Sequence, residues 1–243
     1  AAAVTDETGS GSLVFGTSPT LTTPIISNPT MRAYDGWISD TNTWVFASAT
    51  SFTISGVDAT AYLPIGTLVS YNDGAVDYGV VATVSFSTNT TVTLISNDDY
   101  TIANATLTAP RYSYDVRPQG FPSGFTFTNT ATHTGFSANP TNLLYRYTTI
   151  SRTCFMTIVQ VTAGTSNATT KTLTIPVPAR NITFYAWGAA NRIAVDNGVT
   201  LTGASRAQIL ANGTTVALST DMAVGAWTAS GSARYNFSIF YEF

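Results

Sequence analysis

The sequence predicts an all-β protein, and three observations support this prediction. Residues that favour pleated strands are abundant, among them 13 Phe, 12 Tyr and 4 Trp. Strong helix formers are scarce, and Lys171 is the only lysine. Short runs of alternating apolar and polar residues recur roughly every ten residues between clusters of Gly, Asn and Asp, a pattern typical of barrels and sandwiches. We therefore expect an extended N-terminal arm, a small β barrel or sandwich module, and a C-terminal jelly-roll-like β-sandwich.

Residues 1–30 predict the arm rather than a folded module. Three glycines and three prolines interrupt the segment, which prevents a regular ladder of backbone hydrogen bonds. The segment also lacks the basic start and apolar centre of a signal peptide. Its apolar residues are too few to bury one another, so we expect the arm to pack on a partner chain during assembly; a flexible linker is the alternative. The arm residues that would make this contact are Leu13, Val14, Phe15, Ile25 and Ile26.

Residues 31–122 predict a small β module. Strands are expected at 44–46, 51–55, 67–71, 76–86 and 90–96. Asn72-Asp73-Gly74 indicates a hairpin turn, because Asn, Asp and Gly tolerate the positive φ that tight turns need. Asn97-Asp98-Asp99 is expected to close the next hairpin. The proline-containing stretch 110–122 marks the boundary with the second module.

Residues 123–243 predict the C-terminal sandwich. In the run 153–162, Cys154, Met156 and Ile158 share one face, while Phe155 and Val161 share the other. Both faces are apolar, which indicates a central strand. Tyr235, Phe237, Ile239 and Tyr241 likewise share one face of the last strand. Strands are expected at 143–149, 153–162, 170–177, 182–187, 206–211, 214–219 and 234–242.

Composition excludes several classes of function. Only 9% of the residues are charged and the net charge is −3, so the chain cannot form a basic stripe and nucleic acid is not an expected partner. No apolar run approaches the ~18 residues of a transmembrane helix, so membrane insertion is not expected. One cysteine, Cys154, and one histidine, His133, are too few for a disulfide, a zinc cluster or most Ser-His and Cys-His enzymes.

The remaining polar residues predict no catalytic centre. Carboxylates lie mainly in turns, where Asp beside Gly or Asn is ordinary, so we expect no enzyme and no cofactor. Asp98 and Asp99, or Asp196, offer hard oxygen ligands for Ca²⁺, but an unmetallated turn is the favoured interpretation and no metal is predicted. His133 is expected in a polar surface loop. Cys154 is expected to be a small buried hydrophobe.

Two loops carry the residue types of a sugar-binding site. Aromatic rings stack on the apolar side of a pyranose, and Asn, Asp or Arg supply hydrogen bonds to its hydroxyl groups. The alternative is that Trp187 and Trp227 fill the sandwich core or a subunit interface. The candidate receptor-binding residues are Tyr185, Trp187, Asn191, Arg192, Asp196, Asn197 and Trp227.

Three stretches of the sequence resemble structural appendage proteins of tailed bacteriophages. The first is VTDETGSGSLVF at 4–15, followed by TSPTL at 17–21. The second runs from DGWI at 35–38 to PQGFP at 118–122. The third combines GTSNATT at 164–170 with WTASGSA at 227–233 and the ending Tyr241-Glu242. None of these stretches is a catalytic fingerprint.

This resemblance implies a non-enzymatic virion protein that is made in the bacterial cytoplasm. Its arm would attach to other phage virion proteins, and its C-terminal domain would contact a host surface glycan or protein. The apolar arm and the charge-poor strands also favour a homotrimer, because such surfaces suit buried interfaces. Tail fibre, head fibre and capsid decoration protein all fit the resemblance. A free-standing carbohydrate-binding lectin is a further class that stays open.

Overall fold

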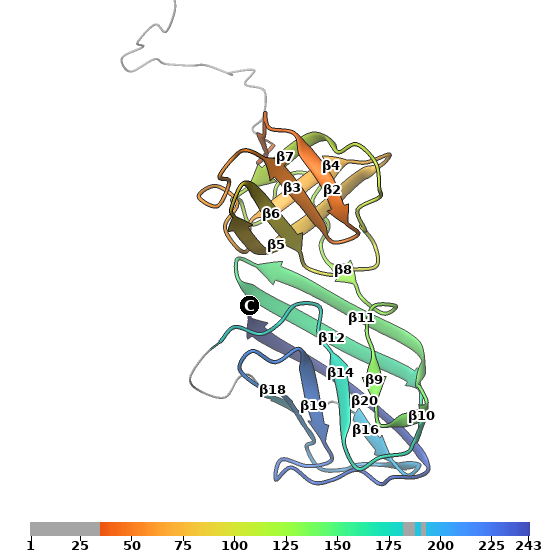
Figure 1. Ribbon diagram of the computed structural model, residues 1–243. Helices are drawn as coiled ribbons and strands as arrows, with labels where there is room; N and C mark the ends of the chain where they lie inside the picture. Colours follow the sequence, from red (N-terminus) through yellow and green to blue (C-terminus); the bar gives the residue numbers. More distant parts are fainter. Residues whose placement is uncertain (1–34, 182–187, 191–192) are drawn as a thin grey trace, which may run out of the picture. The chain divides into compact units, whose positions relative to one another are not determined.

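The computed structural model describes residues 35–181, 188–190 and 193–243 (Figure 1). These residues form strands and turns, and no helix long enough to cross a membrane occurs among them. Residues 35–243 form one compact unit built from antiparallel sheets. The all-β prediction is therefore confirmed. The predicted assembly arm lies outside the described residues, together with its residues Leu13, Val14, Phe15, Ile25 and Ile26.

The first seven strands form a single curled sheet with the order β1-β7-β4-β5-β6-β3-β2. The long strand β5 pairs with β4 along its first half and with β6 along its second, and the register shifts between Val81 and Thr83 where it bends. A bridge between Val45 and Thr106 brings the edge strand β2 back to the start of β7, so the sheet nearly closes on itself. The strands are β1 (Ile38–Ser39), β2 (Trp44–Ser48), β3 (Ser51–Ser55), β4 (Leu68–Asn72), β5 (Val76–Phe86), β6 (Asn89–Leu94) and β7 (Thr108–Ser113).

The interior of this barrel-like module is aromatic and aliphatic. Trp44 stacks on Phe52 with ring centroids 4.1 Å apart, and both side chains are buried. The turn predicted at Asn72-Asp73-Gly74 connects β4 and β5, with Gly74 at φ +133°. The strands predicted at 76–86 and 90–96 form the next hairpin as β5 and β6, which are joined at residues 87–88, and Asn97–Asp99 follows the second of them.

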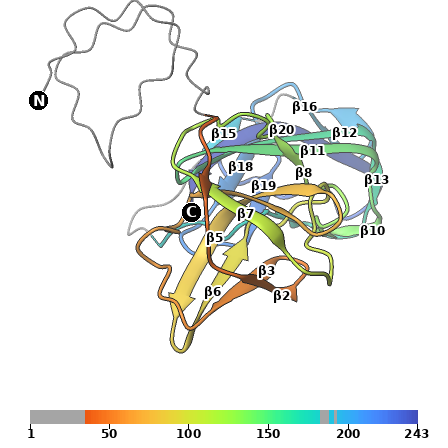
Figure 2. The ribbon, with the colours of Figure 1, turned by 90° about the horizontal axis from the view of Figure 1, so that it is seen from above.

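The remaining strands form two facing sheets, which make a jelly-roll-like β-sandwich (Figures 1 and 2). The larger sheet has the order β10-β13-β20-β12-β11-β8, with β16 and β17 attached beside β20; the smaller has the order β15-β18-β19-β14-β9. The strands of the larger sheet are β8 (Phe125–Thr126), β10 (Phe136–Ala138), β11 (Thr141–Ile150), β12 (Thr153–Thr162), β13 (Gly164–Ser166), β16 (Ile193–Asp196), β17 (Val199–Thr200) and β20 (Ser232–Glu242). Those of the smaller sheet are β9 (His133–Thr134), β14 (Lys171–Thr174), β15 (Gly188–Ala190), β18 (Arg206–Ile209) and β19 (Thr215–Ser219).

Alternation along β12 and β20 places the sandwich core as the sequence predicts. Cys154, Met156 and Ile158 are buried, as are the four residues Tyr235, Phe237, Ile239 and Tyr241. Strand β12 is central, because it pairs with β11 on one side and β20 on the other. Its second face, however, is not covered by another layer in the described chain, and Phe155 is 41% exposed there.

The segment Asn97–Asp99, between β6 and β7 of the barrel-like module, makes hydrogen bonds to the beginning of the sandwich. The Asp98 carboxylate accepts hydrogen bonds from the Thr130 hydroxyl at 2.6 Å and from the Asn129 backbone N–H at 2.7 Å. The Asp99 carboxylate accepts the hydroxyl of Thr126 at 2.7 Å and its backbone N–H. Both carboxylates thus cap the backbone of a neighbouring segment.

Candidate functional site

The receptor site that the sequence predicts falls only partly within the described residues. Tyr185, Trp187, Asn191 and Arg192 lie outside them. Asp196, Asn197 and Trp227 lie within them and can be placed.

Asp196 is the last residue of β16, and Asn197 and Gly198 form the tight turn that follows it. Asn197 has φ +47° and Gly198 has φ +81°, so both adopt the left-handed backbone of a two-residue hairpin. The Asp196 carboxylate accepts the Thr228 backbone N–H at 3.0 Å and the Thr228 hydroxyl at 2.8 Å. Asp196 therefore anchors the loop that follows Trp227, and its oxygens are already occupied by protein donors.

Trp227 fills the core instead of facing a ligand. Its side chain is 2% exposed, and its indole N–H donates to the Leu218 carbonyl oxygen at 2.9 Å. An aromatic platform for a sugar needs an open ring face, so Trp227 is unsuited to the receptor contact considered for it. The alternative interpretation, core packing, describes its position.

The only lysine lies beneath Trp227. The Lys171 ammonium is 4.3 Å from the Phe136 ring centroid and 5.5 Å from that of Trp227. It donates to the Gly135 carbonyl oxygen at 2.9 Å and to the Ser166 hydroxyl at 2.8 Å. Burial lowers the pKa of Lys171, while the nearby Asp196 carboxylate opposes that shift. Its aromatic surroundings are those of a cation–π cage.

His133 occupies a buried polar network and not the predicted surface loop. Its ring nitrogens lie 3.0 Å from the hydroxyl oxygens of Tyr145 and Tyr235. The Gln160 amide donates to the Tyr145 hydroxyl at 2.8 Å and accepts the Tyr235 backbone N–H at 3.1 Å. Burial lowers the pKa of His133 to about 4, so the imidazole is neutral at neutral pH. Nothing in the local sequence Thr-His-Thr-Gly signals partners so distant along the chain.

Cys154 is buried in the sandwich core, near the Tyr241 hydroxyl. Burial raises the pKa of its thiol to about 12, which keeps the thiol protonated at neutral pH. A nucleophilic cysteine needs the thiolate, so this environment is that of a structural residue. The ring nitrogens of His133 are hydrogen-bonded to tyrosines and are not paired with this thiol.

The surface with most exposed apolar side chains is the outward side of the larger sheet, which we call the outer face. Cross-strand pairing brings its residues together: Leu144 lies opposite Val159, and Phe155 lies opposite Phe240 with ring centroids 5.8 Å apart. We define the outer face by the apolar residues Leu144, Ile150, Phe155, Val159, Val161, Ile193 and Phe240. All except the half-buried Val159 are exposed.

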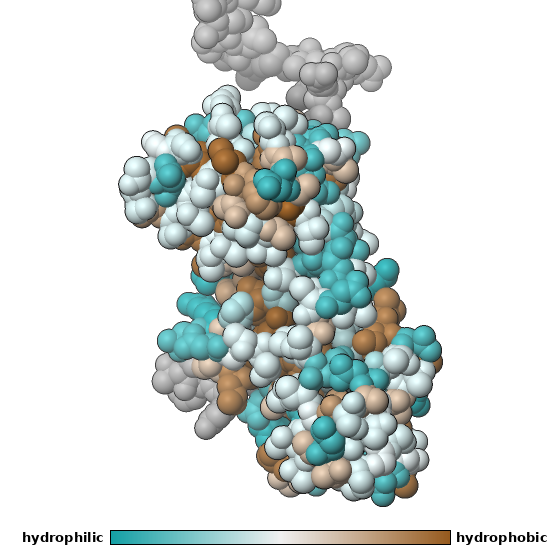
Figure 3. Space-filling model, turned by 45° about the vertical axis from the view of Figure 1, so that its right-hand side comes forward, coloured by the Kyte–Doolittle hydropathy of each residue, from teal (hydrophilic) through white to brown (hydrophobic). Residues whose placement is uncertain are grey.

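The polar residues of the outer face are hydroxyl residues, asparagines and three charged residues, Arg146, Arg234 and Glu242. Thr157 and Ser238 pair across β12 and β20, with their hydroxyl oxygens 3.1 Å apart. A hollow of about 260 Å³ lies beside Phe155, and Arg146 contributes to its wall. On the side that Figure 3 presents, pale residues of intermediate hydropathy cover much of the surface between separate hydrophobic and hydrophilic groups. This surface chemistry suits contact with another protein more than contact with an ion.

Comparisons with protein-family models, with curated proteins and with solved structures give no match to this chain. Functional inference therefore depends on the residues themselves and on their geometry.

Proposed function

We propose that the protein is a non-enzymatic structural protein of a tailed-bacteriophage particle, a fibre-type appendage that assembles as a homotrimer. The arm at 1–30 would attach it to other virion proteins, and the compact unit 35–243 would project toward the host cell surface. The observation that carries the proposal is the outer face. Its exposed apolar residues gather on one side of one sheet, and exposed apolar residues grouped in this way mark an interaction site.

The chemistry of the outer face favours a second copy of the chain as its partner. Aromatic and aliphatic side chains with few charges characterise the centre of oligomer interfaces. In a closed cyclic assembly the same contact is repeated between neighbouring copies. Growth stops when the ring closes, which suits a fibre or appendage. Several copies would also present several weak receptor sites together and so strengthen adsorption.

Light scattering on the purified full chain tests the oligomeric state. We expect a mass three times that of the 25.6 kDa chain. Phe155→Arg places a charge in the interface and should shift the mass toward one chain. The control is Phe86→Arg, because Phe86 is similarly exposed at 44% but lies on β5 in the other module. A wild-type mass near 26 kDa, or equal effects of the two variants, would contradict the trimer.

Immunolabelling of purified particles tests the virion role. An antibody against the chain should decorate the tail tip or fibres of the particle. Labelling over the head shell would instead assign the protein to capsid decoration. Absence of the chain from particles, with a monomeric protein in solution, would favour a free-standing lectin.

A further inference from the structure

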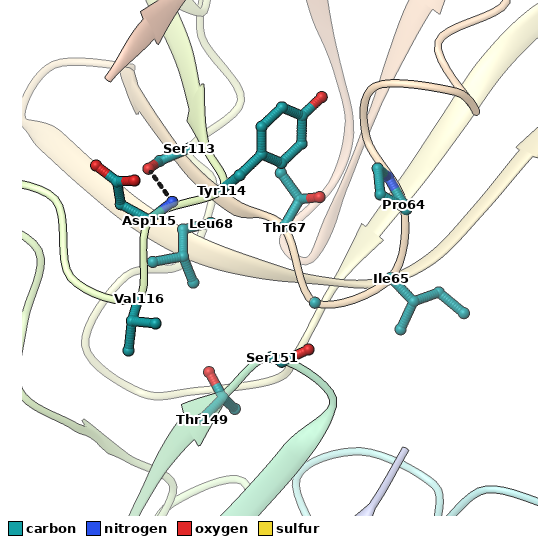
Figure 4. A pocket seen from close by; sticks show the side chains of 11 residues that line it. Pro64, Ile65, Thr67, Leu68, Ser113, Tyr114, Asp115, Val116, Thr149 and Ser151 are labelled. Atoms are coloured by element: carbon teal, nitrogen blue, oxygen red, sulfur yellow. Dashed lines mark hydrogen bonds between the residues drawn. The ribbon is translucent and has the colours of Figure 1, made fainter. Parts of the chain in front are cut away.

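A pocket of about 190 Å³ opens within the compact unit, where the barrel-like module meets the sandwich (Figure 4). Its walls come from three places in the sequence: residues 64–68 at the start of β4, residues 113–116 at the end of β7, and the hairpin between β11 and β12. None of these segments belongs to the loops from which the sequence predicts receptor binding.

The backbone around this pocket is closely fitted. Gly66 has φ +91°, and a Cβ at this position would lie 2.8 Å from the Ser151 carbonyl oxygen. Its N–H donates to the Val81 carbonyl oxygen at 2.8 Å, and the Thr67 N–H donates to the Pro64 carbonyl oxygen at 3.1 Å. The turn is therefore held in place from two directions, and the pocket is preformed.

One polar atom in the pocket has no partner. The Thr149 side chain is 8% exposed, and its hydroxyl makes no hydrogen bond. In Figure 4 this hydroxyl points from the end of β11 into the pocket, below Leu68 and Val116. A buried hydroxyl without a partner is unfavourable, so it marks a position where a ligand atom can supply the missing hydrogen bond.

The rest of the lining combines apolar walls with hydroxyl groups. Tyr114 is 58% exposed, and its hydroxyl donates to the Tyr62 carbonyl oxygen at 2.8 Å, which fixes the orientation of its ring. The Ser113 hydroxyl accepts the Asp115 backbone N–H at 3.0 Å, and in Figure 4 the Asp115 carboxylate points away from Thr149 and Ser151. Asp115 is the only charged residue of the lining. The apolar lining residues are Pro64, Ile65, Leu68, Tyr114 and Val116; the hydroxyl residues are Thr67, Ser113, Thr149 and Ser151.

We propose that this pocket binds one neutral sugar residue of a surface glycan. The apolar wall, including the Tyr114 ring, matches the C–H face of a pyranose, and the Thr149 hydroxyl matches one of its hydroxyl groups. Acidic sugars are disfavoured, because the lining holds a carboxylate and no cation to compensate. The assignment of the glycan to a host cell rests on the proposed function; binding of the sugar itself does not.

Pocket size limits the ligand and its affinity. A volume of about 190 Å³ is below the roughly 300–1,000 Å³ of sites that enclose drug-sized ligands, so one ring fits and a longer chain must extend outside. The free energy gained from few contacts must then offset the entropy that the sugar loses on binding, so a single site binds weakly. Useful adsorption would depend on several copies acting together.

Saturation-transfer NMR on the full chain tests the proposal. The probes are methyl α-glucopyranoside, methyl α-mannopyranoside, methyl β-galactopyranoside and N-acetylglucosamine, with glucuronate as the acidic comparison. We expect at least one neutral sugar to give a saturable signal in the millimolar range and glucuronate to give none.

Two pocket variants and one control locate the binding. Thr149→Val removes the hydroxyl and keeps the shape, so it should weaken binding at least tenfold while the protein stays as stable as wild type. Tyr114→Ala should weaken binding by a similar factor. Thr91→Val makes the same replacement on β6, away from the pocket, and should leave binding unchanged.

The proposal is overturned if none of the neutral sugars binds, if glucuronate binds equally well, or if Thr149→Val and Tyr114→Ala both leave binding unchanged. These outcomes are separate from those of the virion tests. If the protein is present in particles but binds none of the sugars, only the pocket proposal is contradicted. If the protein binds a sugar through Thr149 but is absent from particles, only the proposed virion role is contradicted.

Discussion

The Nδ1 atom of His133 lies 3.0 Å from the hydroxyl oxygen of Tyr235, and this contact joins the two sheets of the sandwich. His133 belongs to β9 in the smaller sheet, while Tyr235 belongs to β20 in the larger one. Because Gln160 donates to the Tyr145 hydroxyl, that hydroxyl can donate its own proton to Nε2 of His133. This order favours the imidazole tautomer that carries its proton on Nδ1 and donates to Tyr235.

The protein should lose stability through His133 as the pH falls from about 6.5 to about 4. Burial lowers the pKa of His133 to about 4 in the folded chain, against 6.5 for an ordinary histidine. Within that window the unfolded chain binds the proton and the folded chain does not, so the free energy of unfolding decreases with falling pH. NMR titration of the single imidazole should show it neutral down to about pH 4.

A variant separates this contribution from other groups. His133→Phe removes the titration and leaves the Tyr235 hydroxyl without its His133 partner, at a cost of about 1–3 kcal/mol, while the Tyr145 hydroxyl keeps its hydrogen bond from Gln160. Its stability should be less dependent on pH than that of the wild type between 6.5 and 4. An imidazole that titrates near 6.5 in the folded chain contradicts the buried network.

Asp77→Asn should stabilise the protein at neutral pH. Burial raises the pKa of Asp77 to about 6, and the Asp73 carboxylate adds to the shift. Asp77 lies across the β4–β5 ladder from Tyr71, whose buried hydroxyl has no hydrogen bond. Between about pH 4 and pH 6 the folded chain binds the proton more tightly, so this contribution to stability is lost as the pH rises through 6.

Chemical unfolding at pH 7 and pH 4.5 measures this effect. The Asp77→Asn variant should have a higher free energy of unfolding than the wild type at pH 7, and this difference should be smaller at pH 4.5. Asp58→Asn is the matched control, because the Thr60 hydroxyl and N–H lower the pKa of Asp58. Asp58→Asn should not stabilise the chain at either pH. Equal effects of the two variants at pH 7 would rule out the Asp73–Asp77 interaction as the cause.

Alternation and turn chemistry predict most of the strands but not the contacts between distant parts of the chain. Strands 51–55, 76–86 and 153–162 form where the sequence predicts them, because a period of two reports directly which residues share a face. The same pattern does not tell whether a second layer covers that face. It therefore predicts a buried position for Phe155, although this side chain is exposed.

The candidate site illustrates the same limit. Trp227 combines aromatic character with a Gly/Ala/Ser loop, and only tertiary structure shows that its ring lies over Lys171. His133 meets Tyr235, which is 102 residues away along the chain. The pocket that contains Thr149 is built from three distant segments, and no local motif marks it.

Gly66→Ala should destabilise the chain more than Gly56→Ala. Both glycines have positive φ, so each alanine carries backbone strain of about 1–2 kcal/mol. At Gly56 no heavy atom lies within 4 Å of the new Cβ, whereas at Gly66 the Ser151 carbonyl oxygen lies at 2.8 Å. Urea unfolding midpoints of the two variants measure the difference. Equal midpoints would show that the turn and the β11–β12 hairpin separate without cost.

Cys154 should resist thiol reagents in the folded protein. Its side chain is fully buried, and burial raises the pKa of the thiol to about 12. The reactive thiolate is therefore scarce at neutral pH, and reagents cannot reach it. Labelling with a chromogenic disulfide should proceed only as fast as the chain opens, and addition of denaturant should restore full reactivity. Rapid labelling of the folded protein would contradict the position of Cys154 in the core.

Lys171 provides a test of what a buried charge contributes to this sandwich. The ammonium lies over the Phe136 and Trp227 rings, and its two hydrogen-bond acceptors also have other partners. The Gly135 carbonyl oxygen accepts the Asn167 N–H at 3.1 Å, and the Ser166 hydroxyl donates to the Thr228 carbonyl oxygen. Removal of the ammonium therefore leaves neither acceptor without a hydrogen bond.

The free energy of unfolding of Lys171→Met should accordingly lie within about 1 kcal/mol of the wild-type value. Methionine keeps a similar length and removes a charge that is costly to bury. Lys171→Ala should cost about 2–5 kcal/mol, since it opens a cavity between Phe136 and Trp227. Thermal and urea unfolding of the two variants at pH 7 give both values. If Lys171→Met costs as much as Lys171→Ala, the ammonium itself stabilises the fold. The cation–π contacts with Phe136 and Trp227 would then outweigh the desolvation of the charge, since such contacts reach about 2 kcal/mol or more when water is excluded.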